Sequence, residues 1–215
     1  MILSAKNITK RIRKSIILDD ISLDLYSGKV YGFVGPNGCG KTMLFRALSG
    51  LMSINSGTIV LDDKILRKDF SVLPSLGIVL ENVSMYPNMT GYENLSYLAK
   101  FKDIINDADI RKAIKLVGLD PKDKRVYRKY SLGMKQRLAI AQAIMESPDV
   151  IMLDEPTNAL DREGLGRIRK VILEQKERGA LVLLASHNQE DIRLLSDVVF
   201  EMENGRVVHR LEVNE

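Results

Sequence analysis

The eight residues GPNGCGKT, from Gly35 to Thr42, constrain the fold of this chain more than any other stretch. They follow VYGFV, an apolar run with the composition of a buried strand, and they precede MLFRALSGL, whose apolar residues recur at helical spacing. Glycines at such a strand-to-helix turn let successive backbone N–H groups converge at the positive end of the helix. The sequence therefore predicts a strand, loop and helix unit that binds an anion, most simply phosphate.

The loop matches the pattern G-x-x-x-x-G-K-[ST], which predicts separate roles for its side chains. Lys41 is expected to pair with the β- and γ-phosphates of a nucleotide, and Thr42 to offer its hydroxyl to Mg²⁺. Cys39 is expected to be a small filler without a redox role. An ordinary glycine-rich turn is the alternative. The expected nucleotide contacts are Gly35, Pro36, Asn37, Gly38, Cys39, Gly40, Lys41 and Thr42.

Two acids and a histidine each follow a further apolar run. Asp154 and Glu155 come directly after VIML, and His187 comes after ALVLLAS. Because α/β sheets place their ligands at the carboxyl ends of the strands, all three are expected near the phosphates. Asp154 would hold Mg²⁺, directly or through water, and Glu155 would orient or deprotonate the attacking water. The structural alternatives are a solvated strand end for the acids and a satisfied structural residue for the histidine.

The remaining pattern predicts an α/β fold with a mostly helical insertion. The first third contains short strands joined by turns, including MILSAKNIT, DDISLDLY and a hairpin in GTIVLDDKIL, which predicts an antiparallel β region. Helices are expected from about residue 90 and over 108–117, 133–146 and 163–178. Apolar runs alternate with helices after residue 149, and the chain ends in a hairpin, DVVFEMENGRVVH. This alternation is typical of a buried parallel sheet.

Length and composition exclude several classes of protein. At 215 residues and 45% hydrophobic content, residues 1–215 are expected to form a single domain with one insertion. The net charge is +4 and no block of like charges indicates a nucleic-acid tail, although the small surplus alone says little about partners. No nucleic-acid partner is expected. Cys39 is the only cysteine, which excludes an intramolecular disulfide and favours the cytoplasm. No apolar run approaches 18 residues and the N-terminus has no secretory pattern, so no membrane span is expected.

Ser131 and Gly133 begin a predicted basic helix in KYSLGMKQRLAIA, although no ligand site lies nearby in sequence. A helix N-terminus attracts anions, Ser131 can donate its hydroxyl, and Gly133 allows close backbone approach. Ser131 can also simply cap the helix, and the two roles are compatible.

Taken in order, these motifs resemble the nucleotide-binding domain of ATP-binding cassette (ABC) proteins over nearly the whole chain. GPNGCGKT looks like the Walker A loop, YSLGMKQR the signature motif, VIMLDEPT the Walker B segment, NALD the D-loop, and Ser186 with His187 the switch histidine. The resemblance implies a P-loop NTPase fold with a RecA-like core, an antiparallel β subdomain and an inserted helical subdomain at residues 82–146. It also implies ATP and Mg²⁺ as cofactors.

The same resemblance implies that two cassettes, identical or different, work as a pair. Each ATP would lie between the phosphate loop of one copy and Ser131 and Gly133 of the other. Glu155 would activate water and His187 would contact the γ-phosphate.

Two positions depart from the family pattern. Glu81 replaces the usual glutamine at the entrance to the helical subdomain; a carboxylate can still meet Mg²⁺, but it adds negative charge beside the phosphates. Near Ile12 the family tends to carry an aromatic residue that stacks on adenine. Tyr26 and Tyr31 are expected to be strand residues, so base stacking is expected to be weak and nucleotide selectivity loose.

The resemblance implies the ATP-hydrolysing subunit of an ABC transporter, peripheral on the cytoplasmic face of the cell membrane. Separate transmembrane permease subunits would carry the substrate, with their contact expected around residues 81–87. ENVSMYPNMTGYENL and YSLGMKQRLAIA are similar to the branch that exports bacteriocins, peptide antibiotics and other drugs. The alternatives are a soluble ABC ATPase in nucleic-acid or iron–sulfur metabolism and a nucleotide-binding regulator without turnover.

Overall fold

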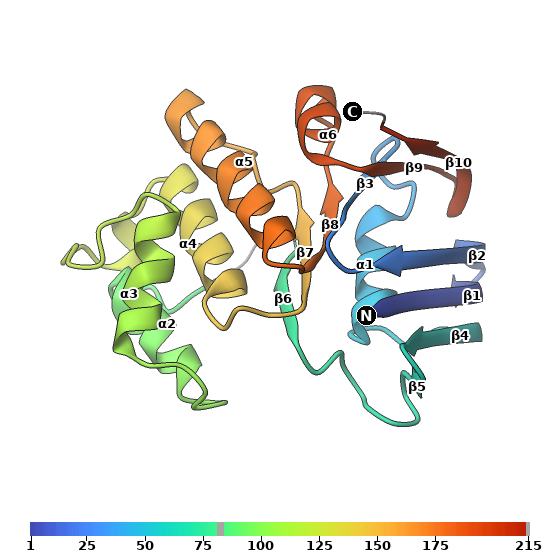
Figure 1. Cartoon of the computed structure of the whole chain (residues 1–215), viewed down its shortest axis with the longest axis horizontal. Helices are drawn as coiled ribbons and strands as arrows, with labels where there is room; N and C mark the ends of the chain where they lie inside the picture. Colours follow the sequence, from blue (N-terminus) through green and yellow to red (C-terminus); the bar gives the residue numbers. More distant parts are fainter. Residues whose placement is uncertain (81–83, 214–215) are drawn as a thin grey trace.

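The computed structural model describes residues 1–80 and 84–213, and its strands form two sheets (Figure 1). Spatially, the larger sheet runs β10 (Arg206–Glu212), β9 (Val198–Glu203), β3 (Val30–Val34), β8 (Leu181–Ala185), β7 (Val150–Asp154) and β6 (Leu76–Val79). All neighbours in it are parallel except β10 and β9, which are antiparallel. β7 and β8 are buried along their whole length, as expected for parallel strands covered on both faces.

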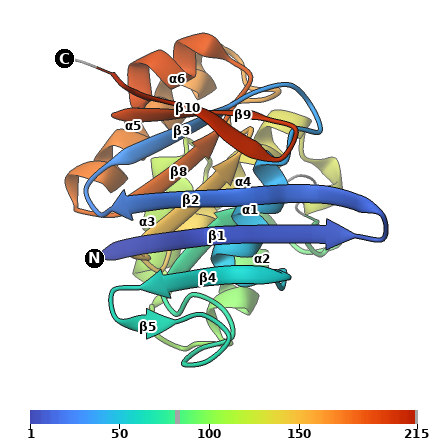
Figure 2. The same ribbon diagram turned by 90° about the vertical axis from the view of Figure 1, so that its right-hand side faces the viewer.

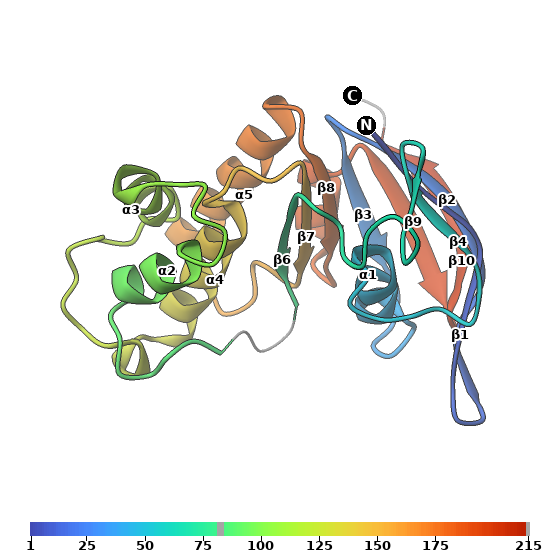
Figure 3. The ribbon, with the colours of Figure 1, turned by 90° about the horizontal axis from the view of Figure 1, so that it is seen from below.

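The smaller sheet is antiparallel and faces the viewer in Figure 2. Its spatial order is β2 (Ser15–Tyr26), β1 (Ile2–Ile12), β4 (Ser56–Leu61) and β5 (Lys64–Ile65). Buried residues alternate along the second half of β2, so one face of this sheet packs on the core. That core also contains helix α1 (Lys41–Ser49), where Phe45 meets Phe33 edge to face at 5.3 Å between ring centroids. Helix α1 therefore lies between the two sheets (Figure 3).

The other face of the larger sheet is covered by helices. These are α2 (Gly91–Ala99), α3 (Asp107–Leu116), α4 (Leu132–Ile144), α5 (Arg162–Glu177) and α6 (Gln189–Leu195), with a short 3₁₀ turn, η1 (Tyr127–Lys129). Alternate residues of β8 divide between the two cores: Val182 and Leu184 pack with the helices, whereas Leu181 and Leu183 pack with α1. Side chains on the two faces of the central strands therefore contribute to both hydrophobic cores.

The structure confirms most of the predicted elements. The capping box of Thr90 and Glu93 opens α2, the hairpin joins β4 to β5, and the strand before the glycine-rich loop is β3. Helix α4 ends at Ile144, two residues earlier than predicted, because the chain turns there: Ser147 adopts a φ of +50° just before Pro148. Strand β6 and helix α6 are additional elements that the sequence pattern did not predict.

Two predictions about organisation are refined. β3 lies in the first third of the chain but joins the parallel sheet, and the C-terminal hairpin extends that sheet because β9 pairs with β3. The predicted helical insertion at residues 82–146 contains α2, α3 and α4, but its first residue, Asn82, lies outside the described residues. Its boundaries, and the extent of a single domain over 1–215, stay predictions.

Within residues 1–80 and 84–213, none of the helices combines the length and the apolar composition needed to cross a bilayer.

Candidate active site

The glycine-rich loop connects β3 to α1 in a conformation that depends on its glycines. Gly35, Gly38 and Gly40 have φ values of +144°, +81° and +112°, which residues with a side chain rarely adopt. A Cβ atom on Gly35 would also lie 2.1 Å from the carbonyl oxygen of Met202 in β9. The glycines therefore let this loop pack tightly against the sheet, and helix α1 begins where the loop ends.

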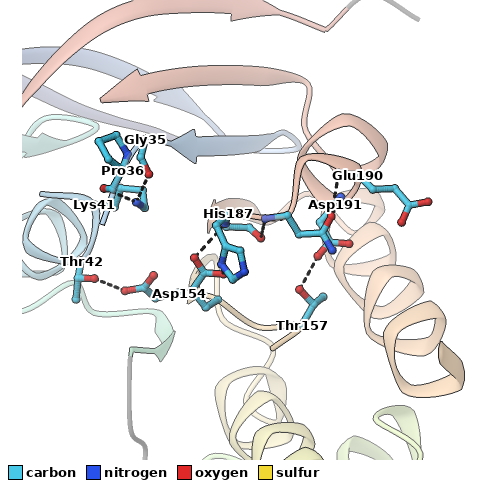
Figure 4. A network of polar contacts seen from close by, with 12 residues as sticks. Gly35, Pro36, Lys41, Thr42, Asp154, Thr157, His187, Glu190 and Asp191 are labelled. Carbon is cyan, nitrogen blue, oxygen red and sulfur yellow. Dashed lines mark hydrogen bonds and ion pairs between the residues drawn. The ribbon is translucent and has the colours of Figure 1, made fainter. Parts of the chain in front are cut away.

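Lys41 is folded into the loop that precedes it. Its Nζ donates to the carbonyl oxygens of Gly35, at 2.7 Å, and Pro36, at 3.3 Å (Figure 4). Only 7% of the residue is exposed. Cys39 is also buried and belongs to the core around α1, which agrees with a filler role. The loop thus concentrates one positive charge beside the helix N-terminus, where an anion would be stabilised.

Thr42 and Asp154 are brought together from α1 and β7. The Thr42 hydroxyl donates a hydrogen bond to Asp154 Oδ2, and Asp154 is 4% exposed. Among the described residues, no group of three or more His, Cys, Asp or Glu side chains is placed to hold a metal ion. A hydroxyl and a carboxylate nevertheless suit Mg²⁺, which typically takes one or two protein oxygens and completes its shell with water and substrate phosphates. The donor set present fits that ion.

Glu155 and His187 meet at the carboxyl ends of β7 and β8. Glu155 has a φ of +50°, and its N–H donates to the carbonyl oxygen of Ala185 at 2.8 Å, which ties it to the end of β8. Its Oε1 accepts the backbone N–H of His187 at 3.0 Å, and its Oε2 lies 2.8 Å from His187 Nδ1. The carboxylate is 16% exposed and the imidazole 63% exposed. A carboxylate and an imidazole therefore lie next to each other at the carboxyl ends of these two strands.

All of these side chains border one cavity of about 640 Å³. Its lining residues are Ile12, Ile17, Asn37, Gly38, Gly40, Lys41, Thr42, Met43, Asp154, Glu155, Asn158 and His187. The predicted phosphate loop, paired acids and histidine are thus brought together although they are far apart in sequence. Of the predicted nucleotide contacts, Gly35, Pro36 and Cys39 are not among the lining residues.

The apolar part of this cavity was only partly expected. Ile12 and Ile17, which flank the turn between β1 and β2, form an aliphatic wall beside the loop. Ile17 was not predicted, since nothing in the residues around it distinguishes it from other strand positions. Tyr26 and Tyr31 lie in strands as predicted: Tyr31 is 1% exposed and its hydroxyl accepts the N–H of Tyr26 at 2.9 Å. Neither tyrosine lines the cavity.

Ser131 and Gly133 lie at the N-terminus of α4, apart from this cavity. Ser131 Oγ accepts the N–H of Met134 at 3.2 Å, which confirms the capping role, and the residue is exposed. A Cβ atom on Gly133 would lie 2.8 Å from the carbonyl oxygen of Ala159. Gln136 of the same helix donates to the carbonyl oxygen of Glu155 at 3.2 Å. The start of α4 therefore packs on the segment that follows the paired acids. Glu81, the other predicted metal ligand, lies outside the described residues.

Comparison with known proteins identifies the family of the chain that carries this site. Residues 18–158 match the family model described as ABC transporter. The chain belongs to the ABC transporter family. Among its relatives, the ABC transporter ATP-binding protein YybJ of Bacillus subtilis, itself uncharacterized, is 46% identical over 94% of this chain and 92% of its own length. The bacitracin transport ATP-binding protein BcrA of Enterococcus faecalis is 35% identical over 100% of this chain and 70% of its own.

Solved ABC structures share the fold. The dimeric structure of the ATP-binding cassette MJ0796, in a post-hydrolysis state with ADP and Pi, superimposes with a TM-score of 0.85 over 99% of both chains at 22% identity. The predicted ABC family and P-loop NTPase fold are thus confirmed. The chain is an ATP-binding subunit of the ABC transporter family and an ATPase by membership of it.

Proposed function

We propose that this chain binds Mg²⁺-ATP in the 640 Å³ cavity and hydrolyses it as one half of a pair of cassettes, which powers transport through separate membrane subunits. The observation that carries the proposal is the meeting of Glu155 and His187 in the same cavity as Lys41, Thr42 and Asp154. Peptide or antibiotic-like compounds are the proposed substrates, moved outward, because the relative BcrA is named for bacitracin transport. The proposed location is the inner face of the cell membrane.

The loop amides, Lys41, Thr42, Asp154, Glu155 and His187 each have a role in the proposed reaction. The loop N–H groups and the α1 N-terminus hold the phosphates, and Lys41 exchanges the carbonyl oxygens of Gly35 and Pro36 for phosphate oxygens. Thr42 and Asp154 would hold Mg²⁺, and the bound ion would supply positive charge to neutralise the phosphates.

Glu155 would accept the proton of the attacking water, since its carboxylate is partly buried and fixed by the N–H of His187. The exposed imidazole of His187 would reach the γ-phosphate. The aliphatic wall of Ile12 and Ile17 offers the base an apolar contact without an aromatic ring, so discrimination between ATP and GTP would be weak.

The proposed pair explains why Ser131 and Gly133 lie outside the cavity of their own chain. A capped helix N-terminus that faces outward is an anion site available to another molecule. In the pair, it would close over the ATP held by the partner copy. Because Gln136 of α4 donates a hydrogen bond to the carbonyl oxygen of Glu155, closure of α4 on the partner's ATP would also affect the catalytic site of its own chain.

Replacing Ser131 with aspartate separates its two roles. Aspartate caps helices as well as serine does, so α4 should keep its stability, whereas alanine would cost about 1 kcal/mol. The added negative charge would repel the partner's phosphates. We expect Ser131→Asp to bind ATP as a monomer within about twofold of the wild type but to lose ATP-dependent dimerisation, measured by light scattering. The uncharged cap in Ser131→Asn is the control, and dimerisation by both variants would contradict the pairing role.

The membrane subunits are proposed to dock on an exposed aromatic patch formed by residues before α2 and around its C-terminal end. The patch consists of Tyr86, Tyr97 and Phe101, which are 48%, 40% and 73% exposed. Tyr97 contacts both Tyr86 and Phe101 edge to face, at 5.1 and 5.5 Å between centroids. Tyr86 also lines a cavity of about 420 Å³, together with Ser84, Met85, Pro87, Asn94, Leu98 and Gln142. Such clusters of exposed aromatics commonly mark protein interfaces.

Recovery of the membrane subunits tests this surface. In cells that express the neighbouring genes, tagged protein purified in mild detergent should bring transmembrane proteins with it. We expect Phe101→Asp to reduce their recovery roughly tenfold, since it puts a charge on a side chain that the proposed contact would bury. Leu51→Asp, at another apolar side chain that is 53% exposed, is the matched control. Equal recovery with both variants would place the contact elsewhere, and a complex without any membrane protein would favour a soluble ABC ATPase.

A further inference from the structure

A buried polar network lies behind the cavity and joins the same two loops that carry Glu155 and His187. Thr157, two residues after Glu155, donates its hydroxyl to Oδ2 of Asp191 at 2.5 Å. Asp191 lies in the first turn of α6, four residues after His187, and is fully buried. Figure 4 shows this contact next to His187. Neither residue lines the cavity, and the proposed reaction does not use them.

Asp191 is held in place by a counter-charge from a third element. Arg169 of α5 donates its Nε to Asp191 Oδ1 at 2.7 Å and also pairs with Glu190 at 2.7 Å. Burial by itself would lower the pKa of Arg169, but its bonds to Glu190 and Asp191 outweigh that effect and raise the pKa. A fully buried carboxylate is costly unless it is paired in this way. The arginine therefore stabilises a charge whose other oxygen points at Thr157.

Only a few residues separate the network from the active site, and hydrogen bonds stabilise both the loop after β7 and the loop between β8 and α6. In the first loop, the N–H of Asn158 donates to the carbonyl oxygen of Glu155 at 3.3 Å. In the second, Asn188 caps α6 by accepting the N–H of Asp191 at 3.3 Å, directly after His187. A displacement of Thr157 relative to Asp191 is therefore transmitted to the acid and the imidazole.

We infer that Asp191 is a positioning residue: by accepting the Thr157 hydroxyl, with Arg169 as its counter-charge, it sets the spacing between Glu155 and His187. The contact between those two is itself made partly by a 63% exposed side chain, which cannot fix the loops alone. The second, buried contact holds them at the spacing that the hydrolytic step requires. This inference rests on the proposed function of Glu155 and His187.

Thr157→Val tests it, because valine keeps the shape and removes only the hydroxyl. We expect kcat for Mg²⁺-ATP to fall about 10- to 100-fold, as for other displacements of about 1 Å, while KM and the binding of a non-hydrolysable ATP analogue change less than about twofold. Thr157→Ser restores the donor and should return kcat to within about threefold of the wild type. In a His187→Ala background, Thr157→Val should have less than about a twofold effect, since the pair it positions is gone.

Three results would overturn the inference: unchanged kcat in Thr157→Val, a rise in KM that matches the fall in kcat, or equal effects of Thr157→Val with and without His187. If the valine variant does not fold, judged by its thermal unfolding, Thr157→Cys keeps the volume with a weaker donor. Its kcat should lie below that of Thr157→Ser, and equality would overturn the inference. Wild-type protein without Mg²⁺-dependent turnover would instead count against the proposed function.

Discussion

Replacing Glu155 with glutamine is expected to slow ATP hydrolysis by at least about 100-fold while ATP binding is retained. Glutamine has nearly the same shape, and its carbonyl oxygen can still accept the backbone N–H of His187 as Oε1 now does at 3.0 Å. It cannot take a proton from the attacking water. Hydrolysis would then no longer separate the pair, so dimers should accumulate in the presence of Mg²⁺-ATP. Phosphate release and light scattering measure the two effects.

The matched control is Glu163→Gln, at a carboxylate that is 84% exposed on α5 and pairs only with Arg167 among the described residues. It should hydrolyse ATP at the wild-type rate. If Glu155→Gln left ATP consumption unchanged, Glu155 would not be the base. Wild-type protein that binds ATP without consuming it would favour the nucleotide-binding regulator.

Replacing Lys41 with alanine is expected to abolish both tight ATP binding and hydrolysis, with a loss of at least about 100-fold in turnover. Lys41 is the only lysine or arginine among the residues described as lining the cavity, and it is almost fully buried there. Its removal would take this side-chain cation away from the phosphates, which would lie beside Asp154 and Glu155 with the loop amides, the α1 N-terminus and Mg²⁺ to balance the charge. Titration with a fluorescent ATP analogue and a phosphate-release assay measure binding and turnover.

Lys64→Ala, in the exposed hairpin of the smaller sheet, is the control for loss of one positive charge. It should change neither binding nor turnover. Thermal unfolding of Lys41→Ala shows whether the loop still folds, since the lysine also bonds the carbonyl oxygens of Gly35 and Pro36. Retained turnover in a folded Lys41→Ala protein would overturn the assignment of this cavity.

Local signals in the sequence predicted most of the elements. The capping residues Thr90 and Asn106 start α2 and α3 close to the predicted positions, and Gly179 follows the end of α5 with a φ of +94°. Such signals depend on a few neighbouring residues, so they can be recognised without knowledge of the fold. β6 and α6 are short, and four or seven residues provide too few repeats for a period to be recognised.

The residues of the candidate site also divide into those that a local sequence pattern predicted and those that it did not. The loop, the paired acids and the histidine each carry a recognisable pattern, and the structure places their side chains around one cavity. Ile17 has no such pattern, because its role comes from the place where the β1 to β2 turn meets the loop. Thr157 and Asp191 were missed because 34 residues separate them and neither is unusual in its own segment. Only the adjacency of β7 and β8 brings their loops together.

The sequence by itself therefore determined the chemistry available to this protein: an anion-binding glycine loop, a lysine, a hydroxyl, two carboxylates and a histidine, each at the end of a predicted strand or the start of a helix. The tertiary structure decided which of these groups face one another. In the folded chain, the Lys41 side chain bonds the loop that precedes it, and Glu155 pairs with His187. Ser131 caps α4, apart from the cavity of its own chain. The physical reason is that hydrogen bonds and capping are local, whereas the order of parallel strands is set by packing two cores against one sheet.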